Sequence, residues 1–215
     1  MSEQCARLHT ACRKLRLFNF PFDETRVPLN GIYVLFQVGE TGHGGSRIVR
    51  VGTHTGDNKL RSRLREHFIN PNKDRSIFRR NIGRALLNRD RDPFLSQWEL
   101  DLTTTEARRT HAPSVDFRKQ AIVEQRVTDY IQKNFHFVAF EIAAKAMRLN
   151  LEARMISTVS LCDECGPSRE WLGLNSPKAK IRESGLWLVN ELYGETLSEA
   201  DLSTLEPVGH WEEPR

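Results

Sequence analysis

The pattern of hydrophobic residues along this chain predicts strands in some segments and helices in others. Residues 31–38 are apolar at nearly every position, which predicts a strand that is covered on both faces, and residues 48–52 form a second short run of this kind. The four glycines within residues 39–46 predict a hairpin loop between these two strands. Residues 135–142 alternate as expected for a third strand.

Helices are predicted where apolar residues recur every three or four positions. In chain order, these segments are residues 3–17, 60–68, 75–87, 114–134, 144–161, 181–192 and 198–205. The stretch between the third and fourth of these segments has no clear period. Helices interleaved with a few strands predict an α/β (α+β) fold, in which a small mixed or antiparallel sheet is flanked by helices.

The composition fits a folded, soluble protein. The length of 215 residues suffices for one sizeable core, and the hydrophobic share of 39% argues against a disordered chain. No apolar run approaches the roughly 18 residues of a membrane-spanning helix, and residues 1–18 lack the apolar segment of a secretory signal. We therefore expect a single domain, residues 1–215, in the cytoplasm and without a membrane partner. The sequence leaves the oligomeric state open.

Positive charge is concentrated in one part of the chain. Residues 58–91 contain 11 Lys or Arg and 3 acidic residues, although the net charge of the whole chain is only +4. A concentrated basic patch is typical of proteins that bind the phosphate backbone of nucleic acids, and a solvated helix face is the other interpretation of such a run. The candidate DNA-binding residues are Arg61, Arg65, Arg79 and Arg80.

A pair of short motifs in the first two predicted strands is the most informative feature. Residues 31–33, Gly-Ile-Tyr, open the first strand, and residues 51–53, Val-Gly-Thr, end the second. An arginine-rich helix follows, in which Arg63 and His67 share one face because they are four residues apart. We expect this face to project over the rim of the sheet where Tyr33 emerges.

Glu152 interrupts an apolar helix face. It lies on the same predicted face as Leu149, Met155 and Ile156, where an ionised carboxylate is costly unless it is paired or binds a cation. One explanation is an ion pair with Arg148 at the edge of this face. The other is a ligand for Mg²⁺, which takes one or two protein carboxylates and keeps several waters.

These motifs, in this order, resemble those of a GIY-YIG nuclease domain. The family's fold is a small three-stranded antiparallel sheet flanked by helices. Its site combines a tyrosine from each motif, an arginine on the first helix and a glutamate on a later helix that binds one divalent metal. The resemblance implies that Tyr33, Arg63 and Glu152 are catalytic and that Glu152 is the metal ligand. His67 fills the position one turn beyond the arginine, where the family often has tyrosine or histidine.

The resemblance covers residues 31–175, which would form the nuclease core. Residues 1–30 would then form an N-terminal helix and connector, and residues 176–215 a C-terminal helical extension. Two positions depart from the family pattern. Arg50 stands in place of the second tyrosine, as a basic residue does in some branches among restriction enzymes. Asn175 is a distant candidate for the asparagine that often follows the catalytic glutamate.

The resemblance implies metal-dependent hydrolysis of phosphodiester bonds, with DNA as the partner and Mg²⁺ or Mn²⁺ as the cofactor. The metal and Arg63 would stabilise charge on the phosphate. An unperturbed phenol has a pKa of about 10, so Tyr33 as the base requires nearby positive charge, such as that of Arg50. His67 is the alternative base. One transition state must touch these groups, so Tyr33, Arg63 and Glu152 should border one open, positively charged concavity.

Two other functional interpretations remain. The first is a GIY-YIG-fold protein that binds nucleic acid but has lost catalysis through the replacement at Arg50. The second is an interaction protein with a basic face. A cleavage assay with DNA and a divalent metal distinguishes both from an active nuclease.

The cysteines give a weak signal for a metal. Cys162 and Cys165 have the spacing of a zinc-ligand pair, but Cys5 and Cys12 do not. Cys12 also fits the apolar face of the first predicted helix. A structural Zn²⁺ site is therefore not expected from the sequence.

The remaining histidines and tryptophans have simple interpretations. His43, His54 and His111 fall in predicted loops, and we expect them to face solvent. Trp171 and Trp187 are expected to cap the core rather than to stack on bases.

Overall fold

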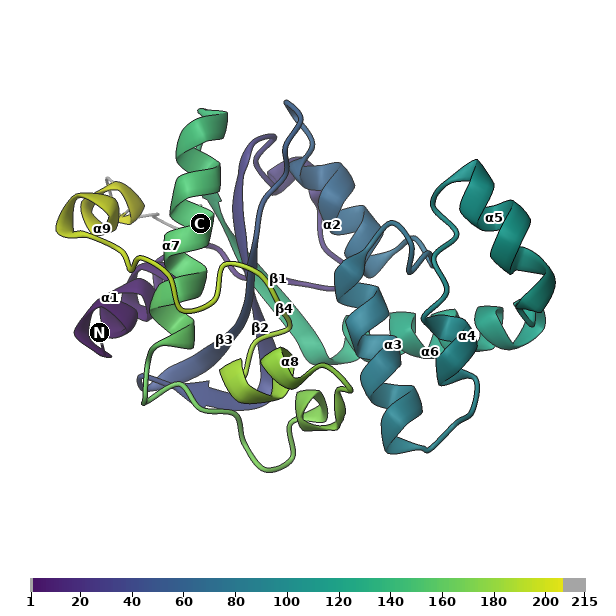
Figure 1. Cartoon of the computed structure of the whole chain (residues 1–215). Coiled ribbons are helices and arrows are strands. Elements are labelled where there is room, and N and C mark those ends of the chain that lie inside the picture. Colours follow the sequence, from purple (N-terminus) through teal and green to yellow (C-terminus); the bar gives the residue numbers. More distant parts are fainter. Residues whose placement is uncertain (1, 207–215) are drawn as a thin grey trace.

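The computed structural model describes residues 2–206, and one antiparallel sheet lies between two layers of helices (Figure 1). The sheet has four strands in the order β1-β4-β2-β3, so β3 forms one edge. The strands are β1 Phe18–Asn19, β2 Gly31–Gly42, β3 Gly45–Gly52 and β4 Phe135–Glu141. The predicted C-terminal extension runs past the described part, and residues 207–215 lie outside it.

The sequence predicts three of these strands, and the fourth, β1, corrects that number. β1 pairs with β4 at the edge opposite β3, and the rings of Phe18 and Phe137 stack there with centroids 4.9 Å apart. It is two residues long and directly precedes the connector that contains Pro21. A segment this short has no alternation that a pattern could detect, because its pairing depends on a distant partner.

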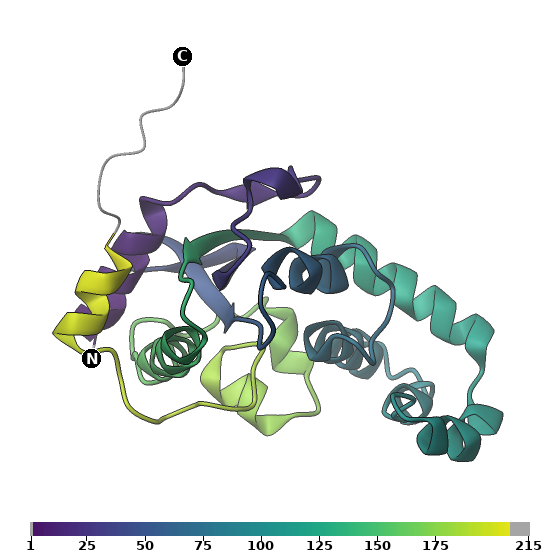
Figure 2. The same cartoon turned by 90° about the horizontal axis from the view of Figure 1, so that it is seen from above.

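The two helical layers cover opposite faces of the sheet. The helices are α1 Ser2–Arg13, α2 Leu60–Phe68, α3 Ile77–Arg89, α4 Leu95–Trp98, α5 Thr105–His111, α6 Phe117–Asn134, α7 Lys145–Ser160, α8 Ala179–Ser184 and α9 Glu199–Leu205, with the 3₁₀ turns η1 Glu24–Arg26, η2 Ala112–Ser114 and η3 Leu172–Asn175. Helices α2, α3 and α6 lie on one side, and α1, α7 and α9 on the other (Figures 1 and 2). None of these helices is long and apolar enough to cross a membrane.

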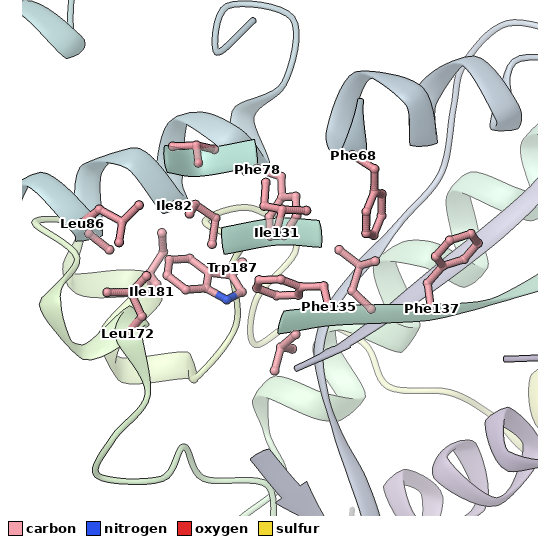
Figure 3. Packing of buried hydrophobic residues seen from close by; sticks show 14 of the residues in the cluster. Phe68, Phe78, Ile82, Leu86, Ile131, Phe135, Phe137, Leu172, Ile181 and Trp187 are labelled. Carbon is pink, nitrogen blue, oxygen red and sulfur yellow. The ribbon is translucent and has the colours of Figure 1, made fainter. Parts of the chain in front are cut away.

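Strand β2 contributes to both hydrophobic clusters. Its side chains at Tyr33 and Leu35 pack into the cluster under α2, α3 and α6, whereas Ile32 and Val34 pack into the cluster under α1, α7 and α9. Figure 3 shows the first cluster, in which Trp187 lies among side chains from α3 and α8. The prediction of a strand covered on both faces is therefore confirmed.

Two glycines of the sequence motifs are required by close contacts between strands. A Cβ atom at Gly31 would lie 2.0 Å from the carbonyl oxygen of Phe140 on β4. Gly52 pairs with Tyr33 across β2 and β3, and a Cβ atom there would lie 2.2 Å from the phenol oxygen. The missing side chain at Gly52 thus leaves room for the ring of Tyr33 over the edge strand.

The predicted apolar face of α7 is shifted. Leu151, Met155 and Ile156 are buried, whereas Leu149 is 38% exposed, contrary to its predicted place on the buried face. The buried face therefore centres on Leu151 and Met155. Glu152 lies half-buried at its border, next to the free edge of β3.

The two tryptophans near the C-terminus belong to the core, as predicted. Trp171 is 1% exposed and Trp187 is fully buried. Both indole N–H groups donate to the same oxygen, Oε1 of Gln37, at 3.0 and 3.1 Å. The segment after α7 is thereby fixed to β2, and this positions the chain that follows Trp187 beside α3.

Candidate active site

Tyr33, His67 and Ser76 form a buried chain of polar groups between β2, α2 and α3. The phenol oxygen of Tyr33 lies 2.7 Å from Nε2 of His67, and Nδ1 of His67 lies 2.7 Å from the hydroxyl of Ser76. Ser76 is the N-cap of α3, where its hydroxyl accepts the backbone N–H of Arg79. All three polar side chains are buried, and Tyr33 and His67 have no exposed surface.

His67 is neutral in this environment. Burial lowers the pKa of His67 well below its ordinary value, and the positive charges of Arg63, Arg50 and Arg79 act in the same direction. A neutral imidazole has one donor and one acceptor nitrogen. Either Tyr33 donates to His67 while His67 donates to Ser76, or both bonds run the other way.

Arg50 joins these buried polar groups to the backbone at Trp187. Its Nε donates to the phenol oxygen of Tyr33 at 3.4 Å, and Nη1 donates to the carbonyl of Trp187 at 2.5 Å. The guanidinium also lies over the ring of Phe78, 5.4 Å from its centroid. Arg50 thus brings a positive charge next to Tyr33, although it replaces the tyrosine that the family pattern has at this position.

Glu152 binds the end of the second strand motif, which is in turn bonded to the start of the first. Its Oε1 accepts the backbone N–H of Thr53 at 2.9 Å, and the hydroxyl of Thr53 donates to the carbonyl of Gly31 at 2.7 Å. The alternative ion pair with Arg148 is not formed, because the Arg148 guanidinium donates to the carbonyl oxygens of residues 142 and 143 instead. Glu152 is therefore tied to the site rather than to its own helix.

Burial and the neighbouring positive charges have opposite effects on the pKa of the Glu152 carboxyl. Burial raises the pKa of the Glu152 carboxyl, while the charge of Arg50 and the N–H of Thr53 act to lower it. Glu191 raises this pKa further, and Arg63 lowers it. A second positive charge at the carboxylate would favour the ionised form.

Glu152 and Arg50 line one pocket of about 260 Å³ at the free edge of β3. Helix α7 packs on the face of the sheet opposite to Tyr33, so Glu152 meets the other layer only around this edge. The pocket is completed by side chains of α3 and by the segment after Trp187, and its lining residues are Arg50, Ile77, Asn81, Glu152, Ile156, Trp187, Leu188, Val189, Asn190 and Glu191.

Tyr33 and Arg63 do not border this pocket. Tyr33 is fully buried behind Arg50. Arg63 is one-quarter exposed, and its Nη1 donates at 3.0 Å both to Glu66 and to the carbonyl of Arg75. The expectation that Tyr33, Arg63 and Glu152 border one open concavity is therefore wrong. Of these three residues, only Glu152 lines the pocket.

Arg79 does not have the position expected of a DNA contact. It is fully buried, and its guanidinium donates to the carboxylate of Glu124, to Thr128 and to the carbonyl of His67. Such a buried ion pair joins α3 to α6 and α2 and holds the residues of the site in place. The basic run of the sequence thus includes a structural arginine.

The other predicted DNA contacts differ in exposure. Arg65 is about half exposed and lies 3.5 Å from Glu24. Arg61 donates to the backbone carbonyls of residues 25 and 27, which fixes the connector before β2. Arg80 is 13% exposed and pairs with Asp74. Of this set, Arg65 presents the most accessible charge to a partner.

Asn175 is remote from the pocket, whereas an unpredicted asparagine lines it. The carbonyl of Asn175 accepts a hydrogen bond from Asn88 at the C-terminal end of α3. Asn81, two turns earlier on α3, lines the pocket, and its Nδ2 is buried without a hydrogen-bond partner in the described part of the chain. Glu191 and Ser76 were also missed, because neither lies in a motif or on a patterned face.

The pocket suits a hard divalent cation. Within residues 2–206, the second oxygen of Glu152 accepts no hydrogen bond, so it is available as a ligand. The carboxylate of Glu191 lines the same pocket. One or two carboxylates, with water and phosphate oxygens completing the shell, are typical for Mg²⁺.

A family model described as "GIY-YIG domain" matches residues 3–211 of the chain. No curated protein and no solved structure matches the chain. The match includes α1 and α9, which lie outside the residues that carry the sequence motifs. The helices at both ends thus belong to the matched unit.

Proposed function

The chain belongs to the GIY-YIG family, and from this premise we propose that it is an endonuclease that hydrolyses DNA phosphodiester bonds with a divalent metal. The observation that carries this proposal is the pocket at the edge of β3, where Glu152 and Arg50 face one space. A carboxylate that holds a cation and a guanidinium that binds a phosphate can both stabilise negative charge during phosphodiester cleavage.

Glu152 is the proposed metal ligand, with Glu191 as a second carboxylate in reach of the same space. Mg²⁺ or Mn²⁺ bound there would supply stabilisation of negative charge on the scissile phosphate and the leaving oxygen. The N–H of Thr53 orients the Glu152 carboxylate through its Oε1 and leaves the other oxygen for the ion.

Arg50 and Arg63 are proposed to offset the charge of the bound phosphate. Arg50 lines the pocket itself, whereas the charge of Arg63 already lowers the pKa of Glu152 from the side of α2. Arginine suits this role because its planar guanidinium binds phosphate through two parallel hydrogen bonds.

Tyr33 is the proposed base, with His67 as the acceptor of its proton. In the tautomer in which His67 donates to Ser76, Nε2 accepts the phenol proton, and the phenol oxygen also receives the N–H of Arg50. Because Tyr33 is covered in the free protein, Arg50 must shift towards a bound phosphate before a water molecule can reach the phenol oxygen. Catalytic hydrogen bonds often reach their working geometry only in the substrate complex.

A second candidate function is favoured by the same burial of Tyr33. If Arg50 keeps the phenol covered, the protein binds nucleic acid and does not cut it. This candidate shares the fold and the basic surface, so binding alone does not separate the two functions.

The test is cleavage of supercoiled plasmid and of single-stranded DNA by the purified chain in Mg²⁺, Mn²⁺ or EDTA. The proposal predicts nicked or linear product with either metal and none with EDTA. Binding of the same DNA in a gel-shift assay without product in any of these buffers would establish the second candidate.

A further inference from the structure

A cluster of sulfur and nitrogen atoms shares no residue with the pocket of the proposed nuclease site. Cys5 and His9 come from α1, His43 from the β2–β3 turn, and Cys165 from the turn after α7. One ligand atom from each of these four residues lies within 4.8 Å of all the others. Cys5, His9 and Cys165 are buried, and the side chain of His43 is 5% exposed.

The spacing of these atoms fits a tetrahedral metal ion. With Zn–S near 2.3 Å and Zn–N near 2.0–2.1 Å, two ligand atoms of a tetrahedron lie roughly 3.3–3.8 Å apart. The sulfur atoms of Cys5 and Cys165 are 3.6 Å apart, and Nε2 of His9 is 3.8 Å from the sulfur of Cys165. Both distances match the edges of such a tetrahedron.

The two histidines are oriented as metal ligands usually are. Nδ1 of His9 lies 2.9 Å from the carbonyl of Cys5, which leaves Nε2 facing the sulfur atom of Cys165. The backbone N–H of Ile48 makes a long bond of 3.3 Å to this Nε2, which a metal would replace. Nδ1 of His43 faces the carboxylate of Glu164 at 3.6 Å. Backbone carbonyls and carboxylates behind the ring are the usual partners of metal-bound histidine.

His43 lies at the tip of the β2–β3 hairpin. His43 and Gly44 have φ 49° and 74°, as a two-residue hairpin turn requires. Despite this place, the imidazole of His43 is turned inward, with its centroid 4.9 Å from that of the His9 ring. The sequence-based expectation that His43 faces solvent is therefore wrong.

We propose that Cys5, His9, His43 and Cys165 bind one structural Zn²⁺. Two thiolates and two imidazoles are a donor set typical of a closed, four-coordinate zinc site. The sequence does not predict it, because it pairs residues 160 positions apart and uses only one cysteine of the Cys162–Cys165 pair. The ion would fix α1 and the β2–β3 turn to the end of α7, apart from the pocket of Glu152.

Two alternatives to this ligand set are Cys162 as a ligand and a disulfide between Cys5 and Cys165. Cys162 lies 3.2 Å from Nε2 of His43, so it borders the cluster without belonging to the four. All four cysteines are free thiols, and the 3.6 Å between Cys5 and Cys165 is far beyond the roughly 2.05 Å of a disulfide.

The test is the metal content of the full chain, purified without chelators and measured by inductively coupled plasma mass spectrometry. We expect about one zinc ion per chain. Cys5→Ser, Cys165→Ser and His43→Ala should each lower the content about tenfold or more, whereas Cys12→Ala, which removes another buried thiol of α1, should retain it. Glu152→Gln should also retain zinc, which separates this ion from the nuclease metal.

Reconstitution keeps the test valid where a variant folds poorly or zinc is lost on purification. The wild-type chain, freed of metal under reducing conditions, should take up one equivalent of Co²⁺ with the visible absorption bands of a tetrahedral thiolate site. Failure of the wild-type chain both to contain zinc and to bind Zn²⁺ or Co²⁺ would overturn the proposal. Loss of zinc in Cys162→Ser with retention in His9→Ala would overturn the ligand set, and a Cys5–Cys165 disulfide with no metal would overturn the site.

Discussion

His67 sets what Tyr33 can do, because it is the nearest group that can take the phenol proton. It has no exposed surface and is surrounded by the charges of Arg63, Arg50 and Arg79, so its pKa lies well below the ordinary value. A neutral imidazole can accept a proton, but this environment makes it a weak base. We therefore assign the base role to Tyr33, and His67 can take the phenol proton only if the positive charge of Arg50 stabilises the phenolate that is left.

The first prediction concerns the pH dependence of stability. The folded pKa of His67 is lowered, so the stability associated with this residue is present above about pH 6.5 and is lost as the pH falls. Below that pH, His67 should contribute a slope of about 1.4 kcal/mol of unfolding free energy per pH unit. In His67→Gln the slope between pH 6.5 and 5, as measured by urea unfolding, should be smaller by this contribution, while His54 and His136, whose pKa values burial also lowers, still contribute. An identical slope in the variant would show that His67 titrates normally.

The sequence identifies single residues of the proposed site only where a motif contains them. Tyr33, His67 and Glu152 could be predicted because each stands at a defined place in a strand or helix pattern. Asn81 and Glu191 could not, because they line the pocket only through the packing of α3 and of the segment after Trp187. Nothing in their local sequence distinguishes them from other polar residues.

At the scale of elements, the pairing of β2 with β3 positions the site. Tyr33 lies opposite Gly52, and Thr53, directly after the strand, donates its N–H to Glu152. The same strand carries Arg50 two residues before Gly52, so its side chain also meets Tyr33. Both strand motifs thus act as one unit, and Gly52 leaves the space that Tyr33 occupies.

The second prediction is that Gly52→Ala displaces Tyr33. The added Cβ would lie 2.2 Å from the phenol oxygen, so the ring must move and its bond to His67 must break. We expect a loss of about 1–3 kcal/mol in unfolding free energy and a strong loss of cleavage. Gly45→Ala on the same strand is the matched control, because its Cβ meets only the side chain of Arg13, at 3.4 Å. Equal behaviour of the two variants would contradict this role of Gly52.

The sequence predicts long elements better than their exact faces and ends. The apolar run of β2 and the period of α2 correctly predict both elements, because burial on a continuous face leaves a regular pattern. The buried face of α7 is shifted, with Leu149 exposed, because it includes Arg148 together with Leu151 and Met155, and a buried arginine leaves no signal in an apolar pattern. The expectation that His54 faces solvent is wrong. Its side chain is only 6% exposed, because its Nε2 accepts the N–H of Gly31.

At the scale of the whole molecule, the basic run of the sequence divides into structural and accessible charges. Arg79 is buried against Glu124 and stabilises the contact between α3 and α6. Arg75 is exposed directly before α3, and its carbonyl accepts the hydrogen bond of Arg63. Arg75 is therefore an accessible charge on the segment that Arg63 contacts.

The third prediction concerns this accessible charge. Arg75→Glu should weaken binding to all DNA sequences alike and lower the slope of log affinity against log salt by about one unit, because it removes a phosphate contact. Arg118→Glu, an exposed arginine of α6, is the control with the same charge change. Fluorescence anisotropy at several salt concentrations measures both slopes. Equal effects of the two changes would indicate diffuse attraction rather than a defined DNA-binding face.

The central claim is that Glu152 binds the metal of a nuclease, and single-turnover cleavage by Glu152→Gln tests it most directly. Because burial raises the pKa of Glu152, the neutral amide should fold as stably as the wild type above that pKa. We predict a loss of cleavage of about a hundredfold or more in Mg²⁺, with DNA affinity in EDTA unchanged. Cleavage at the wild-type rate, or a loss that appears in Glu191→Gln instead, would contradict the claim.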